Sequence, residues 1–286
     1  MHPVIAVDIG GTKLAVATVA PDGTVVERVD APTAAHGSAE DLWTTLTGLI
    51  DSLRHSTDAT ALGCGCGGPM TAGGESVSPL NITAWRDFPL RARLAERTGL
   101  PVFVDNDAKA LALGEGTFGA ARGVANYIGM VVSTGIGGGI VIDGRMLDGT
   151  AGNAGHIGHT IVEPDGRECA CGARGCVEAE VSGTAIAAIT GRPPAEAAPE
   201  IRARAGVLGG RAIASVAALL DLHLAGVAGS VALGYGDEFF AAAQAEIDAR
   251  CRIAFARGTR VIPGALGSDG PVVGAACLAL RRRQAW

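Results

Sequence analysis

The 286-residue sequence has few charged and few aromatic residues, and it lacks the features of several protein classes. Charged residues make up 18% of the chain and aromatic residues 4%, whereas 48% of the residues are hydrophobic, which excludes a disordered chain. The formal net charge is -6, and the basic residues concentrate only at 281–283, which we interpret as the solvated end of a last helix. We therefore expect no nucleic-acid partner and no anionic membrane surface as a partner.

The sequence also lacks any uninterrupted apolar run of the roughly 18 residues that a membrane-spanning helix needs, and from its first residues we expect no signal peptide. We expect a cytoplasmic protein that does not enter a membrane. The chain is longer than one compact core usually requires, which favours two domains or lobes.

Glycine, in contrast, is abundant, with 43 residues that gather at the ends of apolar runs. At such places a backbone turns sharply or approaches a ligand closely. The run "PVIAVDIGGTKLAVATVAPDGTVVERVDAP" predicts three strands, and the Asp-Gly of "PDGT" is typical of a hairpin. A similar pattern, "NYIGMVVSTGIGGGIVIDGRML", opens the second half of the chain. We interpret the two halves as a weak structural repeat of two α/β lobes.

Amphipathic patterns predict helices between the strands. One lies in 38–53 with Ser38 as its N-cap, and another in 88–100 is stopped at Gly99. A strand in 101–106 leads through the polar tip "DND" into a further helix. The alternation continues to a last helix in 271–286 and predicts mixed sheets covered by helices. Ligands of such folds bind in the crevice at strand ends, here between the lobes.

Two glycine loops, at 8–12 and 133–139, occupy equivalent places in the two halves. Neither matches a common nucleotide fingerprint, but consecutive small residues let backbone N–H groups converge on an anion. Thr12, Ser133 and Thr134 add hydroxyl donors. The alternative is that each loop is only a tight hairpin turn.

Acidic residues stand at the ends of two predicted strands. Asp8 ends an otherwise apolar strand, where a carboxylate is costly unless it is solvated, paired or near a cation, and this favours Mg²⁺ beside phosphates. In "VDND", Asp105 or Asp107 could accept a proton from a hydroxyl nucleophile while Asn106 holds the same ligand. An Asx-rich turn that caps the following helix is the alternative.

One imidazole and three thiols gather within eighteen residues, with the spacing His-x9-Cys-x-Cys-x4-Cys, at His159, Cys169, Cys171 and Cys176. These are the ligands of a closed, tetrahedral structural zinc site. Three free cysteines near a helix cap are the alternative. The other four cysteines lie in apolar or helical contexts, so we expect them to be small buried hydrophobic residues.

In chain order, the motifs "DIGGTK", "NDAKALALGE", "STGIGGG", "GNAGHIGH" and "CACGARGCVEAEVSG" resemble the ROK family of bacterial sugar kinases, and the zinc cluster is the most telling of them. The resemblance spans residues 8–183. It implies an α/β, actin/hexokinase-like (ribonuclease H-like) fold with two lobes and a cleft between them. We expect a small lobe from 1–107 plus 273–286 and a large lobe from 108–272 that carries the zinc site.

The resemblance implies ATP-dependent transfer of the γ-phosphoryl group to a sugar hydroxyl, usually at C6. Mg²⁺ would accompany ATP, and Zn²⁺ would be structural. Asp107 matches the catalytic base. The implied sugar-binding residues are Gly68, Asn106, Asp107, His156, His159 and Glu178. The implied nucleotide-binding residues are Asp8, Gly10, Gly11, Thr12 and Lys13 in the first loop, Thr134, Gly135, Gly137 and Gly138 in the second, and Gly229 and Ser230 near the adenine. The matching zinc ligands are His159, Cys169, Cys171 and Cys176.

His156 departs from the family's usual pattern, in which a glutamate at this place accepts hydrogen bonds from sugar hydroxyls. A neutral imidazole offers one donor and one acceptor instead of two acceptor oxygens and a charge. "AGHIGHT" resembles bacterial N-acetylmannosamine kinases, so N-acetylmannosamine and glucose are both candidate substrates. The alternative is that His156 only supports the zinc site.

Other functions stay open beside the kinase. A sugar-responsive repressor would need a helix-turn-helix segment ahead of the first strand, and we expect none because Asp8 already lies in the first loop. A non-catalytic sugar-binding or regulatory ROK protein and a kinase of a rarer sugar or cyclitol are the remaining alternatives. Members of the family are commonly dimers or tetramers, so we expect a homodimer or homotetramer.

Overall fold

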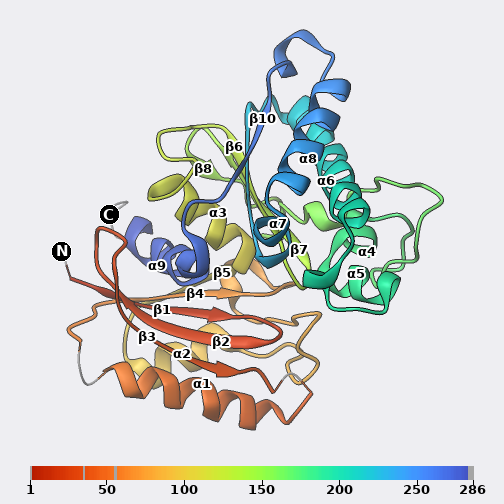
Figure 1. The fold of residues 1–286 in the computed structure, drawn as a ribbon. Helices are drawn as coiled ribbons and strands as arrows, with labels where there is room; N and C mark the ends of the chain where they lie inside the picture. The colour runs from red at the N-terminus through yellow and green to blue at the C-terminus, as the bar shows by residue number, and fades with distance from the viewer. Residues whose placement is uncertain (1, 35, 55–56, 283–286) are drawn as a thin grey trace. The chain divides into compact units, whose positions relative to one another are not determined.

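A computed structural model describes residues 2–34, 36–54 and 57–282 (Figure 1). Backbone contacts divide the chain into two compact units. Unit 1 comprises Met1–Phe118, Asp148–Ala154 and Leu266–Trp286, and unit 2 comprises Gly119–Leu147 and Gly155–Ala265. These bounds differ from the expected lobes by one helix and two short segments, because 108–118, 148–154 and 266–272 belong to unit 1.

Unit 1 contains a five-stranded sheet in the order β3-β2-β1-β4-β5. The strands are β1 (Val4–Ile9), β2 (Lys13–Val19), β3 (Val25–Pro32), β4 (Leu62–Cys66) and β5 (Val102–Asn106). β1 pairs antiparallel with β2 and parallel with β4, and β4 pairs parallel with β5. The carboxyl ends of β1, β4 and β5 therefore lie at the same edge of the sheet.

Side chains of β1 alternate between two apolar cores, as the period-2 pattern of a strand requires. Ile5, Val7 and Ile9 pack with α1 (Ala39–Arg54) and α2 (Leu90–Thr98) on one face. Val4 and Ala6 pack with α9 (Gly270–Arg282) on the other face, where α9 also contacts α3 (Asp107–Thr117) (Figure 1). Both faces of the sheet are covered, which explains why β1 reads as an almost continuous apolar run.

Two of the expected helix ends are confirmed. The hydroxyl oxygen of Ser38 accepts a hydrogen bond of 3.0 Å from the backbone N–H of Asp41, as an N-cap does. Gly99 has the left-handed conformation after α2, and its N–H donates to the carbonyl of Ala95.

Unit 2 contains a second five-stranded sheet, in the order β10-β9-β6-β7-β8. Its strands are β6 (Tyr127–Val132), β7 (Ile136–Ile142), β8 (Arg145–Met146), β9 (Leu224–Ala228) and β10 (Arg260–Pro263). The helices of this unit are α4 (Val177–Val181), α5 (Gly183–Thr190), α6 (Pro199–Leu220), α7 (Ser230–Tyr235) and α8 (Asp237–Arg250). Short 3₁₀ helices lie in the connections of the two units, at Ala72–Gly74, Ile157–His159, Pro194–Glu196, Ala254–Ala256 and Gly267–Asp269.

The two sheets have the same topology. Each begins with an antiparallel hairpin, β1–β2 or β6–β7, and continues with two strands that run parallel to the first strand of that hairpin. The expected repeat is thus confirmed at the level of the fold, and it places the two glycine loops at equivalent hairpins.

Among the described residues, α6 is the one helix that is long and apolar enough, by length and composition, to cross a membrane. Half of the apolar window in this helix is buried inside the protein, and α6 packs against α8 in the core of unit 2. Packing in this core accounts for the apolar composition of α6.

Candidate functional site

The first glycine loop is a tight connection between β1 and β2. The N–H of Gly10 donates to the carbonyl of Lys13 at 3.0 Å, and the hydroxyl of Thr33 donates to the carbonyl of Gly10 at 2.7 Å. A Cβ atom at Gly11 would lie 2.8 Å from the Cβ of Asn81, so a side chain there would collide with its neighbour. The loop is a hairpin turn in its geometry, and its binding of phosphate stays a prediction.

Asp8 and Asp107 are two acidic residues at the carboxyl edge of the unit 1 sheet. Burial raises the pKa of Asp8 to about 7, and the nearby carboxylate of Asp107 adds to the rise, against the opposing charges of Lys13 and Arg28. Burial also raises the pKa of Asp107, which is the first residue of α3. A Cβ at Gly65 would lie only 3.3 Å from the Cα of Asp107, so the small residue lets the start of α3 approach β4.

Asn106 caps α3. Its side-chain oxygen accepts hydrogen bonds from the backbone N–H groups of Ala108 and Lys109, at 3.0 and 3.3 Å. The carboxylate of Asp107 also accepts from the N–H of Ala108, at 2.8 Å. The capping interpretation of "VDND" therefore describes the local structure, and it fixes the place of Asp107. The role of Asn106 in sugar binding stays a prediction. Gly68 lies just after β4, and its carbonyl accepts a hydrogen bond of 3.1 Å from the backbone N–H of Leu80, while its predicted contact to the sugar stays a prediction.

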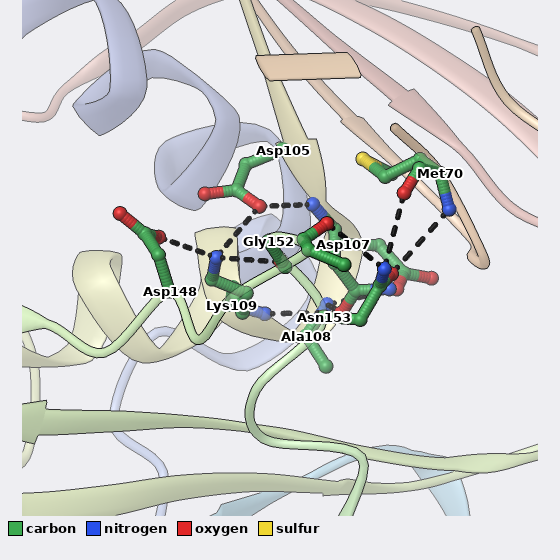
Figure 2. Close-up of polar contacts among 10 residues, drawn as sticks. Met70, Asp105, Asp107, Ala108, Lys109, Asp148, Gly152 and Asn153 are labelled. Atoms are coloured by element: carbon green, nitrogen blue, oxygen red, sulfur yellow. Dashed lines mark hydrogen bonds and ion pairs between the residues drawn. The ribbon is translucent and has the colours of Figure 1, made fainter. Parts of the chain in front are cut away.

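The sequence analysis missed a group of polar contacts beside Asp107 (Figure 2). The ammonium of Lys109 contacts carboxylate oxygens of Asp105 at 3.0 Å and of Asp148 at 2.7 Å. It also donates to the carbonyl of Gly152 at 3.2 Å. The spacing of Asp105 and Lys109, four residues apart, was a signal for part of this group. Nothing local in the sequence indicates its long-range part.

Glu178 connects α4 to the second glycine loop in unit 2. Its carboxylate accepts a hydrogen bond from the backbone N–H of Ile136, and burial raises its pKa to about 7. The carbonyl of Ser133, in the same loop, accepts from the N–H of Gly183 at 2.7 Å. The loop is thereby held by residues that follow the cysteine cluster.

The glycines of β7 allow the "GHIGH" segment to pack against this strand. A Cβ at Gly138 would lie 3.0 Å from the side chain of Ile157, and a Cβ at Gly155 would lie 2.4 Å from the carbonyl of Gly138. Gly155 also has a φ of +100°, a conformation that glycine adopts without strain. Two glycines of the predicted motifs are therefore required by close packing.

A cavity of about 490 Å³ in unit 2 joins two sets of residues that the sequence analysis assigned to the nucleotide. The lining residues are Thr134, Gly183, Thr184, Pro193, Pro194, Ala195, Ser230, Val231, Gly234 and Tyr235. The hydroxyl oxygens of Ser133 and Ser230 lie 3.0 Å apart, and Gly229, with a φ of +99°, precedes α7. Volume and lining are those of a small-molecule site.

The four predicted zinc ligands come together in unit 2. Their ligand atoms all lie within 4.8 Å of one another. The Sγ atoms of Cys171 and Cys176 are 3.8 Å apart, and Nδ1 of His159 is 3.8 Å from Sγ of Cys169. A tetrahedral zinc with its usual bond lengths requires sulfur atoms about 3.8 Å apart. The residues therefore fit a zinc ion, which would tie the cysteine loop to His159.

His156 lies next to this cluster, and its ring centroid is 6.1 Å from that of His159. The structure thus places the two histidines side by side. It leaves both interpretations of His156, sugar contact and support of the zinc site, as predictions.

Comparison with known proteins identifies the family. Residues 4–282 match the sequence profile of the ROK family. The chain belongs to the ROK family. It is 40% identical to the glucokinase of Thermotoga maritima over 184 residues, which are 64% of this chain and 58% of that protein. It is 37% identical to an N-acetylmannosamine kinase of Escherichia coli O157:H7 over 252 residues, covering 81% of this chain and 84% of that one.

Among solved structures, a ROK family glucokinase from Streptomyces griseus, in complex with glucose and AMPPNP, superposes with a TM-score of 0.85 at 30% identity. The match covers 96% of this chain and 98% of that one. The actin/hexokinase-like α/β fold expected from the sequence is confirmed. The chain spans less than two thirds of the T. maritima glucokinase but nearly the whole S. griseus glucokinase.

Proposed function

We propose that this ROK protein is an ATP-dependent sugar kinase, which transfers the γ-phosphoryl group to a hydroxyl, at C6, of a hexose or N-acetylhexosamine. The observation that carries the proposal is the partly buried carboxyl of Asp107 at the start of α3, near Asp8 at the carboxyl edge of the sheet. The relatives named glucokinase and N-acetylmannosamine kinase support the reaction type.

Asp107 acts as the general base in this proposal. Phosphoryl transfer depends mainly on positioning and on neutralising charge, with a carboxylate that receives the proton of the attacking hydroxyl. Burial raises the proton affinity of Asp107 above that of an ordinary aspartate, which suits a base that must take up a proton during the reaction. The cap by Asn106 holds Asp107 at the start of α3, directly after β5.

The nucleotide would occupy the cavity lined by Thr134 and Ser230 in unit 2, with the backbone N–H groups of the second glycine loop directed at its phosphates. Mg²⁺ bound with ATP supplies charge neutralisation. The partly buried carboxyl of Asp8 is an oxygen ligand suited to this hard cation, either directly or through water. A cation there would also relieve the repulsion between the carboxylates of Asp8 and Asp107.

The substrate is proposed from His156. An imidazole in place of a carboxylate changes the pattern of donors and acceptors that sugar hydroxyls meet. This favours N-acetylmannosamine over glucose, in keeping with the E. coli relative. A structural zinc ion, a cytoplasmic location and a homodimer or homotetramer complete the proposal.

An ADP-release assay tests the activity and the substrate together. ATP, Mg²⁺ and the protein are combined with glucose, mannose, N-acetylglucosamine, N-acetylmannosamine or allose, and His156→Glu is assayed alongside. We expect N-acetylmannosamine to give the highest kcat/KM and the variant to shift toward glucose. A preference of the unaltered protein for glucose would refute the role of His156. Sugar binding without any turnover would favour the non-catalytic alternative.

A further inference from the structure

The side chain of Lys109 is a buried cation whose partners come from two places in unit 1, the strand β5 and the segment 148–154. Its side chain is 2% exposed. The ammonium contacts Asp105 at 3.0 Å, Asp148 at 2.7 Å and the carbonyl of Gly152 at 3.2 Å. An ammonium has three N–H donors, so these three acceptors match its hydrogen-bonding capacity.

These contacts fasten the segment 148–154 to α3 (Figure 2). Within the segment, the N–H of Ala154 donates to the carbonyl of Asp148 at 3.0 Å. Asn153 makes a second set of polar contacts. Its side chain accepts a hydrogen bond from the backbone N–H of Met70 at 3.4 Å and donates one to the carbonyl of Met70 at 3.1 Å. The segment is held from two sides by polar contacts and leads directly into the "GHIGH" residues.

The ammonium of Lys109 contacts the carboxylates of Asp105 and Asp148. The raised pKa of Asp107 follows from burial, opposed by backbone N–H groups. Lys109 is two residues after Asp107 on the same helix, so its contacts to Asp148 and Gly152 join the segment 148–154 to the helix that begins with Asp107.

We propose that Lys109 is a positioning residue, which fixes the segment 148–154 on the helix that begins with Asp107. The segment would thereby fix the position of the residues that directly precede His156. The proposal rests on the sugar-kinase function proposed above, and it adds a determinant of sugar binding outside the residues that the motifs indicate.

Three variants separate positioning from stability. Lys109→Met removes the cation and leaves the carboxyl of Asp105 without it. Asp105→Asn combined with Lys109→Met also removes the carboxylate of Asp105, so the destabilisation by an unpaired charge at Asp105 is relieved. The double variant does not restore the contacts to Asp148 and Gly152. Arg97→Met breaks the exposed ion pair of Arg97 with Asp51 in the same unit and is the matched control.

In steady-state kinetics with the preferred sugar, we expect Lys109→Met to lower kcat/KM for the sugar about 10–100-fold, because small misplacements of binding groups have effects of this size. KM for ATP should stay within about twofold, since none of the partners of Lys109 is a residue that we assign to the nucleotide. The double variant should regain most of the melting temperature but not the lost kcat/KM, and Arg97→Met should behave like the unaltered protein. A double variant that regains both would overturn the proposal, because Lys109 would then serve stability alone.

Hydrogen exchange of the segment 148–154 gives a readout that requires no turnover. We expect exchange in this segment to speed up at least about tenfold in Lys109→Met, while β1 and β4 keep their protection. Unchanged exchange in the segment refutes the positioning role even if the protein is an active kinase. If the unaltered protein phosphorylates no sugar, the proposed function fails, and the exchange result still decides whether Lys109 fixes the segment.

Discussion

The carboxylate of Glu178 accepts a hydrogen bond from the backbone N–H of Ile136, in the second glycine loop. Glu178 lies two residues after the predicted zinc ligand Cys176, at the start of α4. One side chain thus connects the cysteine cluster to a loop that we assign to the phosphates. Its second oxygen is available, in the proposed function, for a sugar hydroxyl.

Replacement of Glu178 should separate these two roles. Glu178→Gln keeps an oxygen acceptor for the N–H of Ile136 but loses the negative charge. Hydrogen bonds to charged groups are worth about 1.5–3 kcal/mol, so we expect KM for the sugar to rise by about 10–100-fold. KM for ATP should change little. Glu178→Ala loses both contacts and should raise both KM values. Steady-state kinetics measure this split. Equal KM values for the sugar in Glu178→Gln and in the unaltered protein would show that Glu178 does not bind the sugar.

Asp107→Asn should abolish the base without disturbing the cap of α3, since Asn106 supplies the capping oxygen. We expect kcat to fall about 10²–10⁴-fold, the usual contribution of a general base, while the sugar is still bound. Calorimetric titration of the sugar and a turnover assay together measure the effect. Asp51→Asn, at an exposed acid on α1, is the control. Turnover that survives in Asp107→Asn would show that another group accepts the proton.

Asp8 should make stability depend on pH in the absence of Mg²⁺ and ATP. Its pKa is raised from 3.8 to about 7, so between these values the folded state holds a proton that the unfolded state has lost. The free energy of unfolding therefore falls as pH rises through this window, and the loss is complete above about pH 7. Asp8→Asn removes this loss.

We expect Asp8→Asn to raise the melting temperature at pH 8 by about 2–4 °C and to change it little at pH 4, with reduced kcat at both. Thermal unfolding at the two pH values is the measurement. An equal gain at both pH values would show that the effect of Asp8 on stability is not one of ionisation.

Zinc removal should loosen the segment from His159 to Cys176. We expect about one zinc ion per chain in the purified protein, and a chelator should lower both the melting temperature and the activity, because the ion replaces contacts that a loop rich in glycine does not make. Cys171→Ser should have the same effect, and Cys251→Ser, outside the cluster, should retain zinc. Atomic emission and thermal unfolding measure this. An unchanged melting temperature after chelation would contradict a structural zinc.

Much of the fold follows from the sequence, because its signals are local. A short apolar run predicts β1, Ser38 and Gly99 mark helix ends, and the spacing of His159 and the cysteines indicates a group of potential metal ligands. Each of these signals lies within a few residues of the structure that it specifies.

The contacts around Lys109 could be predicted only in part. The pair with Asp105 has helical spacing, but Asp148 and Gly152 lie 39 and 43 residues further on, and Asn153 meets Met70 across 83 residues. Such pairs depend on how the whole chain folds. The roles of Asn106 and Glu178 were assigned from motifs for ligand contacts, whereas their observed hydrogen bonds, to a helix end and to a loop N–H, come from the backbone around them.

The central claim is the transfer of a phosphoryl group to a sugar hydroxyl, and phosphorus NMR of the products tests it most directly. The protein is incubated with ATP, Mg²⁺ and the sugar that gives the fastest ADP release, beside Asp107→Asn. We predict that ADP and the sugar 6-phosphate appear in equal amounts, and that both form at least about 100-fold more slowly with the variant. ADP accompanied by inorganic phosphate, or ADP release that does not depend on the sugar, would contradict the account.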